Sequence, residues 1–202
     1  MTTKERILNI ALNLFSERGY SAVYVTDIAE EVGIKAPSLY KHFKSKEDIF
    51  ESCINCFYAK MEDMHKKLLP QADQEIKFYK NIEENELLMI TDSLFDFYLT
   101  DDVASKFRKM LIVERYRNKK LNLIFEKLFI EGAVEHQTAV FRKLIQAGVF
   151  KKSDPKILAF HFYTPIFFLL QKYDLHPEKI DEAFAELAVL IHDFHQKYGI
   201  KK

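Results

Sequence analysis

The residues best suited to contacting another molecule form a positively charged segment near the amino terminus. Residues 33–46 contain Lys35, Lys41, Lys44, Lys46 and His42 but no acidic residue. Residues 1–50 as a whole carry seven Lys or Arg and seven Asp or Glu, so this positive charge is a local concentration. Within a Debye length of about 8 Å, such a concentration attracts phosphate groups whatever the net charge. A solvated lysine face is the structural alternative, and spacing and charge alone favour neither.

Two other groups of residues could carry chemistry. Cys53 and Cys56 form a C-x-x-C pattern, which in other contexts is a redox pair or half of a zinc site. They fall within a helical apolar stripe and there is no second cysteine pair, so we interpret them as small buried apolar residues, with a thiol sensor as the lesser alternative. His192 and His195 share a helical face, but the sequence offers no clear further ligand, and we expect no metal site and no cofactor. We find no sequence signature of an enzyme, and we expect the protein to have no enzymatic activity.

The positively charged segment lies in a region that is predicted to form short helices joined by tight turns. Thr2 and Glu5 have the spacing of a capping box, and apolar residues at three- and four-residue steps predict a first helix that ends near Gly19. Thr26 is a candidate cap for a second helix that ends at Gly33. A third begins at residues 35–37, because proline is tolerated in a first helical turn. Two short helices joined by a glycine turn predict a helix-turn-helix over residues 25–44.

Composition agrees with an all-α fold. The chain of 202 residues has only 5 Gly and 5 Pro, which leaves few turns, and 30 basic and 30 acidic residues cancel. Two cysteines and a charged amino terminus predict a cytoplasmic protein without a signal peptide. The most apolar segment, residues 157–170, is too short to span a bilayer and predicts a buried helix.

Longer helices follow from Ser45 onward. Ser45 and Asp48 supply a cap for a helix that Pro70 ends. We expect the remaining helices at residues 74–84, 86–99, 101–117, 121–147, 154–173 and 177–198. The chain then divides into a three-helix domain at residues 1–50 and a larger helical domain at residues 51–202.

The larger domain is expected to bind a small molecule. Pro165 interrupts an apolar helix that also contains polar side chains, and a kinked helix of mixed polarity could line a pocket for a largely apolar ligand. Each polar residue is individually more often a satisfied core residue than a ligand contact. The candidate ligand residues are Tyr98, Tyr116, His136, Gln137, His161, Thr164 and Phe168.

The last helix carries a heptad-like apolar repeat. Its members step by 4, 3, 4 and 3 residues, which is typical of a helix-helix seam. Other faces of this helix are apolar too, so we expect the last two helices to form a four-helix bundle with a second subunit. The expected dimer interface consists of Ile180, Phe184, Leu187, Ile191 and Phe194.

The amino-terminal region resembles the TetR family of bacterial regulators over residues 3 to about 55. The resemblance rests on VTDIAEEVGI followed by KAPSLYKHFKSKEDIF, in which Leu39-Tyr40-x-His42-Phe43 precedes Ser45-Lys46-Glu47. It implies that Thr26, Tyr40, His42 and Lys46 contact DNA phosphates, while Lys35, Ala36, Pro37, Ser38 and Lys41 face base edges. Lys35 stands where many members have Ser or Thr, which suggests that it contacts DNA rather than capping the helix.

Together these patterns predict a ligand-responsive transcriptional repressor. A homodimer would bind a near-palindromic DNA operator, and a largely apolar effector would change the spacing of the two recognition helices. We expect no membrane partner. The alternative is a helical protein that sequesters a small molecule and whose amino-terminal corner is only structural.

Overall fold

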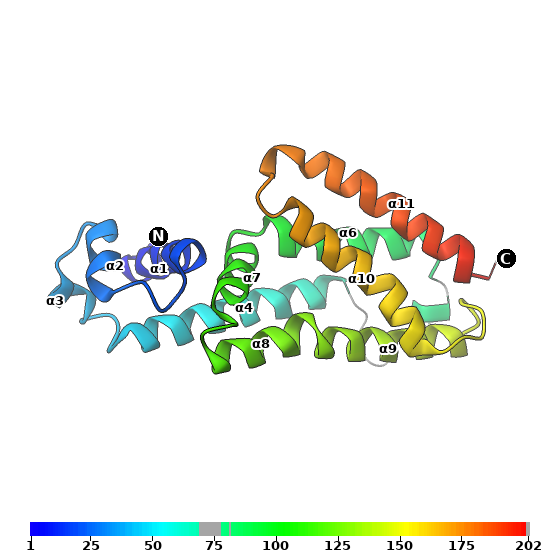
Figure 1. Ribbon diagram of the computed structural model, residues 1–202, viewed down its shortest axis with the longest axis horizontal. Helices are drawn as coiled ribbons and strands as arrows, with labels where there is room; N and C mark the ends of the chain where they lie inside the picture. Colours follow the sequence, from blue (N-terminus) through cyan, green and yellow to red (C-terminus); the bar gives the residue numbers. More distant parts are fainter. Residues whose placement is uncertain (69–77, 81, 201–202) are drawn as a thin grey trace. The chain divides into compact units, whose positions relative to one another are not determined.

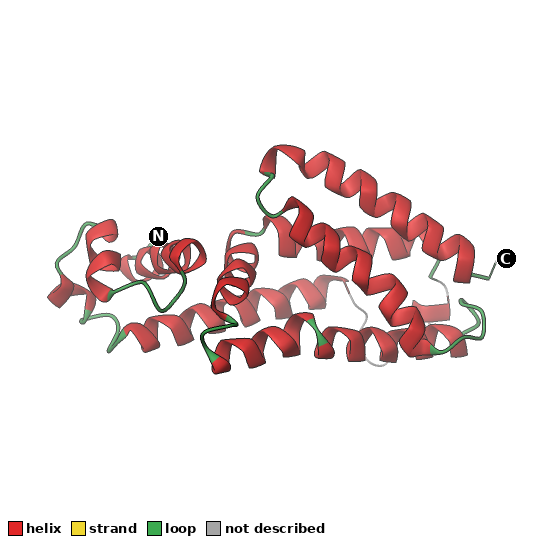
Figure 2. Cartoon of the chain, viewed as in Figure 1, coloured by secondary structure: helices red, strands yellow, loops and turns green. Residues whose placement is uncertain are grey.

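The computed structural model describes residues 1–68, 78–80 and 82–200, and these residues are mainly helical. Figure 2 shows the helices in red and their connections in green. No β-strand occurs in these ranges, although an isolated antiparallel bridge joins Phe150 and Gly199. The all-α expectation is therefore confirmed, with an amino-terminal helix-turn-helix followed by further helices.

The helices are labelled in Figure 1, and each begins and ends at a definite residue. They are α1 (Thr3–Arg18), α2 (Val25–Val32), α3 (Ala36–Leu39), α4 (Lys46–Leu68), α6 (Glu84–Thr100), α7 (Asp102–Glu114), α8 (Lys119–Phe129), α9 (Glu131–Gln146), α10 (Pro155–Tyr173), the 3-10 turn η1 (Pro177–Lys179) and α11 (Ile180–Tyr198). Of the helix expected at 74–84, residues 78–80 are helical, residues 82 and 83 are not, and most of the remainder lies outside the described residues.

Several helix ends follow the sequence signals. The Thr2 hydroxyl accepts from the N–H of Glu5, whose carboxylate accepts from the N–H of Thr2, so the expected capping box begins α1. Asp154 caps α10 by accepting from the N–H of Lys156, with Pro155 in the first turn. These ends are confirmed because each depends on residues two or three positions apart.

The single helix expected over residues 121–147 is wrong, because α8 ends at Phe129 and α9 begins at Glu131. Ile130 lies between them with φ −118° and ψ −94°, outside helical values. At Gly132 the chain passes so close to the preceding turn that a Cβ there would lie 1.9 Å from the carbonyl oxygen of Lys127. Glycine alone fits this approach, and the junction is visible as a short green segment in Figure 2.

The chain forms two compact units. The first unit comprises residues 1–64 and 100–125, so it contains α1 to α3, most of α4, α7 and the start of α8. Within it α7 packs against α1, and the rings of Phe57 and Phe107 stack with centroids 4.4 Å apart. The expected division into residues 1–50 and 51–202 stays a prediction about function, and the first compact unit extends beyond residue 50 because α7 completes its core.

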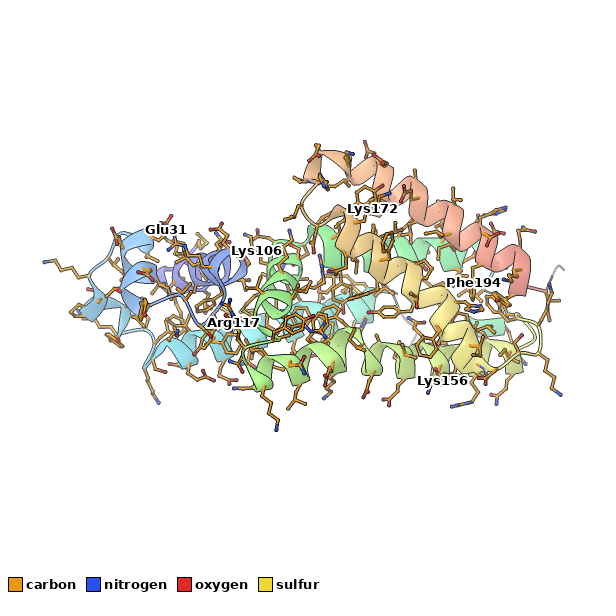
Figure 3. The ribbon with its side chains drawn as sticks, in the orientation of Figure 1. Glu31, Lys106, Arg117, Lys156, Lys172 and Phe194 are labelled. Atoms are coloured by element: carbon orange, nitrogen blue, oxygen red, sulfur yellow. The ribbon has the colours of Figure 1, made fainter. Side chains whose placement is uncertain are left out.

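The second unit comprises residues 65–99 and 126–202. Its core is rich in aromatic side chains from α9, α10, α11 and the segment between α9 and α10. The ring of Phe141 lies 5.3–5.4 Å from the rings of Phe150, Phe162 and Phe194. Phe194, labelled in Figure 3, comes from α11. An ion pair also joins two of these helices, since the ammonium of Lys172 on α10 donates to the carboxylate of Glu186 on α11. Burial of this many rings stabilises the unit by about 1.5–3 kcal/mol for each fully buried side chain.

No helix within the described ranges is both long enough and apolar enough to cross a lipid bilayer.

Candidate functional site

The helix-turn-helix is built on a small buried core. Ile28, Ala29 and Val32 of α2 are at most 2% exposed, and after the turn Leu39 and Phe43 are 0% and 2% exposed. Two backbone hydrogen bonds close the turn: the N–H of Gly33 donates to the carbonyl oxygen of Glu30, and the N–H of Ile34 donates to that of Ala29. These apolar residues fix which side of α3 faces inward, so the intervening residues face outward.

The outward side carries the positive charge that the sequence indicated. Lys35, Pro37, Lys41 and His42 are exposed, Tyr40 is 53% exposed, and Ala36 and Ser38 are partly buried. The acidic residues that follow are engaged elsewhere, since Glu47 binds Tyr20 and Lys120 while Asp48 accepts from the N–H of Lys44. Every residue of this surface belongs to the first compact unit. An exposed cationic segment that contains no acidic residue can approach a polyanion.

The cap expected at Thr26 is wrong. The second helix begins one residue earlier, at Val25, with Tyr24 in the capping position, and the Asp27 carboxylate accepts from the N–H of Tyr24 at 2.7 Å. Thr26 is exposed in the first turn of α2. At the start of α3, Lys35 caps without a side-chain hydrogen bond, as its departure from Ser or Thr indicated. The third helix is also shorter than the predicted helix-turn-helix over residues 25–44 required, because α3 ends at Leu39 and turns follow it.

Lys46 does not project freely from the surface. Its ammonium group donates to the carbonyl oxygens of Tyr20 at 3.0 Å and Val23 at 2.8 Å and lies 4.4 Å from the centre of the Tyr20 ring. Two of its three donors are therefore used within the protein. One donor remains, so the contact of Lys46 with a DNA phosphate stays a prediction.

The candidate ligand residues do not come together. Tyr116 is 85% exposed and belongs to the first unit, whereas the other candidates belong to the second. His161, Thr164 and Phe168 are exposed on α10, with the imidazole of His161 hydrogen-bonded to the Tyr198 hydroxyl. Tyr98 is partly buried, with its ring 5.3 Å from that of Phe129.

His136 and Gln137 lie on α9, where His136 is exposed and Gln137 partly buried. Desolvation by the surrounding protein atoms lowers the pKa of His136, and repulsion from the Lys143 ammonium lowers this pKa further. Burial also lowers the pKa of His65, and His136 contributes by repulsion. These two histidines are thus close enough to influence each other, a relation that the sequence gave no sign of.

The heptad residues of α11 face inward. Leu187, Ile191 and Phe194 are 0%, 2% and 5% exposed because they pack in the core of the second unit, and Phe184 packs edge-on against Phe95. Leu187, Ile191 and Phe194 are therefore occupied within the chain and are not available to a second subunit. Ile180 and Phe184 are partly buried, and their place in a dimer interface stays a prediction. Helices α10 and α11 nevertheless keep some large apolar side chains exposed. These are Ile157 (49%), Phe160 (45%) and Phe168 (62%) on α10 and Val189 (68%) on α11.

The remaining candidates separate clearly. Cys53 is buried as expected, but Cys56 is exposed, so the interpretation of both cysteines as buried apolar residues is wrong for Cys56. The Nδ1 atoms of His192 and His195 face the carboxylate of Glu84 at 2.5 and 3.0 Å, a partner that the sequence did not reveal. Among the described residues no group of three or more His, Cys, Asp or Glu is arranged to hold a metal ion.

The turn between α1 and α2 makes contacts that sequence reasoning missed. Glu114, at the end of α7 and 1% exposed, accepts from the Ser21 N–H at 3.0 Å and the Ser21 hydroxyl at 2.8 Å. Neither residue belongs to a recognisable motif, and 93 positions separate them. Only the packing of α7 on α1 brings them together.

A helix-turn-helix with an exposed cationic face, followed by a second all-helical unit, defines a class of regulatory proteins. Residues 7–53 match the family model described as bacterial regulatory proteins, tetR family. The chain is also similar to the negative transcriptional regulator IcaR of the biofilm operon icaADBC, with 46% identity over 55 residues for the Staphylococcus aureus protein and 44% for that of Staphylococcus epidermidis. This match covers 27% of the chain and 30% of each relative.

Solved structures extend the similarity in fold along the chain. SmeT of Stenotrophomonas maltophilia in its triclosan complex aligns with a TM-score of 0.71 and 18% identity, covering 100% of this chain and 93% of SmeT. A transcriptional regulator from Saccharomonospora viridis in complex with choline aligns with a TM-score of 0.69 and 20% identity, covering 98% of both chains. Residues 7–53 are therefore similar to the tetR family of bacterial regulatory proteins, and the fold of the chain is similar to that of solved TetR-family regulators.

Proposed function

We propose that this protein is a transcriptional repressor that binds double-stranded DNA through the helix-turn-helix of its first unit. The observation that carries the proposal is the exposed, acid-free face of residues 33–44, held outward by the buried Leu39 and Phe43. Phosphates supply most of the affinity of such a face, and contacts to base edges supply its specificity.

The residues divide between these two tasks. Thr26, Tyr40 and His42 have short polar tips on the exposed surface and would contact phosphates. Lys35 and Lys41 are long enough to reach guanine acceptors or phosphate. Small residues at the helix start allow a close approach to base edges, and these are Ala36, Pro37 and Ser38.

A second copy of the chain would complete the binding site. Ile157, Phe160 and Phe168 are exposed on α10, in steps of three and eight residues, and α11, which carries Val189, packs beside it (Figure 1). Exposed apolar residues of this size commonly mark an interface with another protein. A two-fold dimer through this face would present two recognition helices to half-sites about 34–36 Å apart, which matches a near-palindromic operator.

A largely apolar small molecule bound in the second unit would act as effector. Relatives of similar fold bind triclosan and choline, which supports a small-molecule role for this unit. Helix α4 contributes residues to both units, so an effector that prefers one position of α4 would change the separation of the recognition helices. Effector and operator would then weaken each other equally, typically by 5- to 150-fold.

The test is a titration of labelled duplex DNA from the region flanking the protein's own gene, at several salt concentrations. Replacing Lys35 and Lys41 together with alanine should weaken binding at least tenfold and reduce the slope of log affinity against log salt by about 2. The matched control is Lys152→Ala with Lys179→Ala, which removes two exposed lysines from the second unit and should leave both quantities unchanged.

The parent protein binding this DNA no more tightly than an unrelated duplex would refute the proposal. Tight binding of an apolar compound in that case would favour the sequestering protein instead.

A further inference from the structure

The turn that leads from α1 into α2 is held in a conformation that needs close contacts. It begins at Gly19, whose φ of +84° is a backbone conformation that side chains rarely adopt. It ends at Tyr24, whose N–H bonds to Asp27 at the start of the helix-turn-helix. The position of this short turn therefore sets where α2 begins.

Glu114 holds this turn from the side of α7. Its two carboxylate oxygens accept separately from the N–H and the hydroxyl of Ser21. A Cβ at position 19 would lie 2.4 Å from Glu114 Oε1, so the glycine leaves the space that the carboxylate occupies. A carboxylate only 1% exposed has lost most of its hydration, and it is tolerated only where hydrogen bonds replace the water.

Helix α4 holds the same turn from another side. Lys46 donates to the carbonyl groups of Tyr20 and Val23, and the Tyr20 hydroxyl donates to Glu47 at 2.7 Å. Lys120, at the start of α8, binds Glu47 and Glu51 in turn. The backbone of the turn thus has fixed partners on α4 and α7, and a shift of either helix would move it.

We infer that Glu114 is a positioning residue for DNA recognition, which acts through Ser21 on the start of the helix-turn-helix. The segment Thr100–Phe125 then helps to position the helix-turn-helix for DNA binding, although it lies far along the chain from the recognition helix. This inference rests on the proposed DNA binding. Glu114 itself is buried, so its role would be indirect.

The experiment compares four full-length proteins: the parent, Glu114→Ala, Glu114→Gln and Leu111→Val. Leu111 is 0% exposed and lies one turn earlier on α7, so Leu111→Val is a control that weakens the packing of α7 without touching Ser21. Each protein is measured for DNA affinity, for thermal unfolding, and for hydrogen exchange of a peptide spanning residues 19–28.

Removal of the acceptor should weaken DNA binding in Glu114→Ala by about tenfold, the size expected when a hydrogen bond to a charged group is lost. Exchange in residues 19–28 should accelerate by a similar factor. Glu114→Gln keeps an acceptor for the Ser21 N–H and should remain within threefold of the parent in both measurements. Leu111→Val should unfold at a lower temperature but bind DNA as the parent does.

Two outcomes would overturn the inference. One is a loss of affinity in Glu114→Ala no greater than in Leu111→Val, and the other is an equal loss in Glu114→Gln and Glu114→Ala. If Glu114→Ala does not fold, Ser21→Ala takes its place, and unchanged exchange and affinity in that variant would equally overturn it. Exchange is measured without DNA, so a parent that binds no DNA refutes the proposed function separately.

Discussion

At the scale of single residues, Lys46 has a structural task that its position in the motif did not suggest. It bonds to two backbone carbonyl groups of the turn before α2, and its charge lies over the Tyr20 ring. Cation–π contacts of this kind contribute about 0.5–1 kcal/mol at partly exposed sites. The hydrogen bonds add to this because the two carbonyl groups would otherwise lose a donor.

Replacing Lys46 with methionine separates the structural role from a DNA contact. Methionine keeps much of the aliphatic stem but donates no hydrogen bond, so the free energy of unfolding should fall by about 1–2 kcal/mol in a denaturant titration. The salt dependence of DNA binding should keep the parent's slope if the two backbone hydrogen bonds are the whole role of Lys46. A slope reduced by about 1 would instead return Lys46 to the phosphate-binding residues.

Sequence reasoning at this scale succeeded where partners are close in the chain. The capping pair Thr2 and Glu5 was predictable because the partners are three positions apart. Thr26 was assigned as a cap because threonine favours that position, but Asp27 bonding back to Tyr24 moved the helix start by one residue. Contacts such as that of Ser21 with Glu114 could not be predicted, because they depend on how distant helices pack.

At the scale of elements, α7 is anchored at its first turn by Asp101. One carboxylate oxygen accepts from the N–H groups of Val103 and Ala104, both at 3.0 Å, and the other lies 2.6 Å from the Lys60 ammonium. Burial raises the pKa of Asp101, but the Lys60 ammonium and the backbone N–H groups outweigh it and hold the pKa below its usual value. The first unit therefore gains stability from the ionised carboxylate.

Asp101→Ala should lower the free energy of unfolding by about 1 kcal/mol at neutral pH, most of it from the lost cap. The ion pair adds little because the Lys60 side chain is 45% exposed. Because the folded pKa is depressed, this stabilisation is present above the unfolded pKa of about 3.9 and disappears as the pH falls through the lower folded value.

Unfolding titrations of parent and variant at several pH values check this prediction. The difference between them should shrink below about pH 4, and a difference that grows with acidity would contradict it. Asp101→Asn is the control, since it keeps a capping oxygen while removing the charge.

The last helix explains why element type was easier to predict than its partner. The 4-3-4-3 spacing correctly indicated a helix with an apolar stripe, but such a stripe fits any neighbouring helix. In the structure Leu187, Ile191 and Phe194 meet the chain's own core. The exposed Phe168 and Val189 carry no such periodic signal, so the outer face could only be identified once the inner one was known.

At the scale of the whole molecule, the outer face of α10 and α11 predicts the oligomeric state. Phe168→Glu together with Val189→Glu should convert a dimer to a monomer in sedimentation velocity at micromolar concentration, because the charges would be buried unpaired against the second copy. Met89→Glu is the control, since Met89 is 59% exposed and belongs to α6 rather than to α10 or α11. A monomeric parent would contradict the prediction.

The compact units show a further limit of sequence reasoning at this scale. Helical periodicity predicted that α7 is a helix, but it did not predict that α7 packs in the amino-terminal unit. A local pattern of apolar residues does not identify the helix against which it packs. Ala104, Phe107 and Met110 are all 0% exposed within that unit. The family resemblance covered only the first quarter of the chain and so did not include them.

The unequal environments of the two thiols make the chain suitable for site-selective labelling. Burial raises the pKa of Cys53 to about 12, with a contribution from Cys56, so Cys53 carries almost no thiolate at neutral pH, whereas Cys56 is exposed. A thiol-reactive spin label would therefore attach once per subunit, on α4, without any engineered cysteine. In the proposed dimer, the distance between two such labels would report directly on how far apart the two α4 helices move when the proposed effector is added.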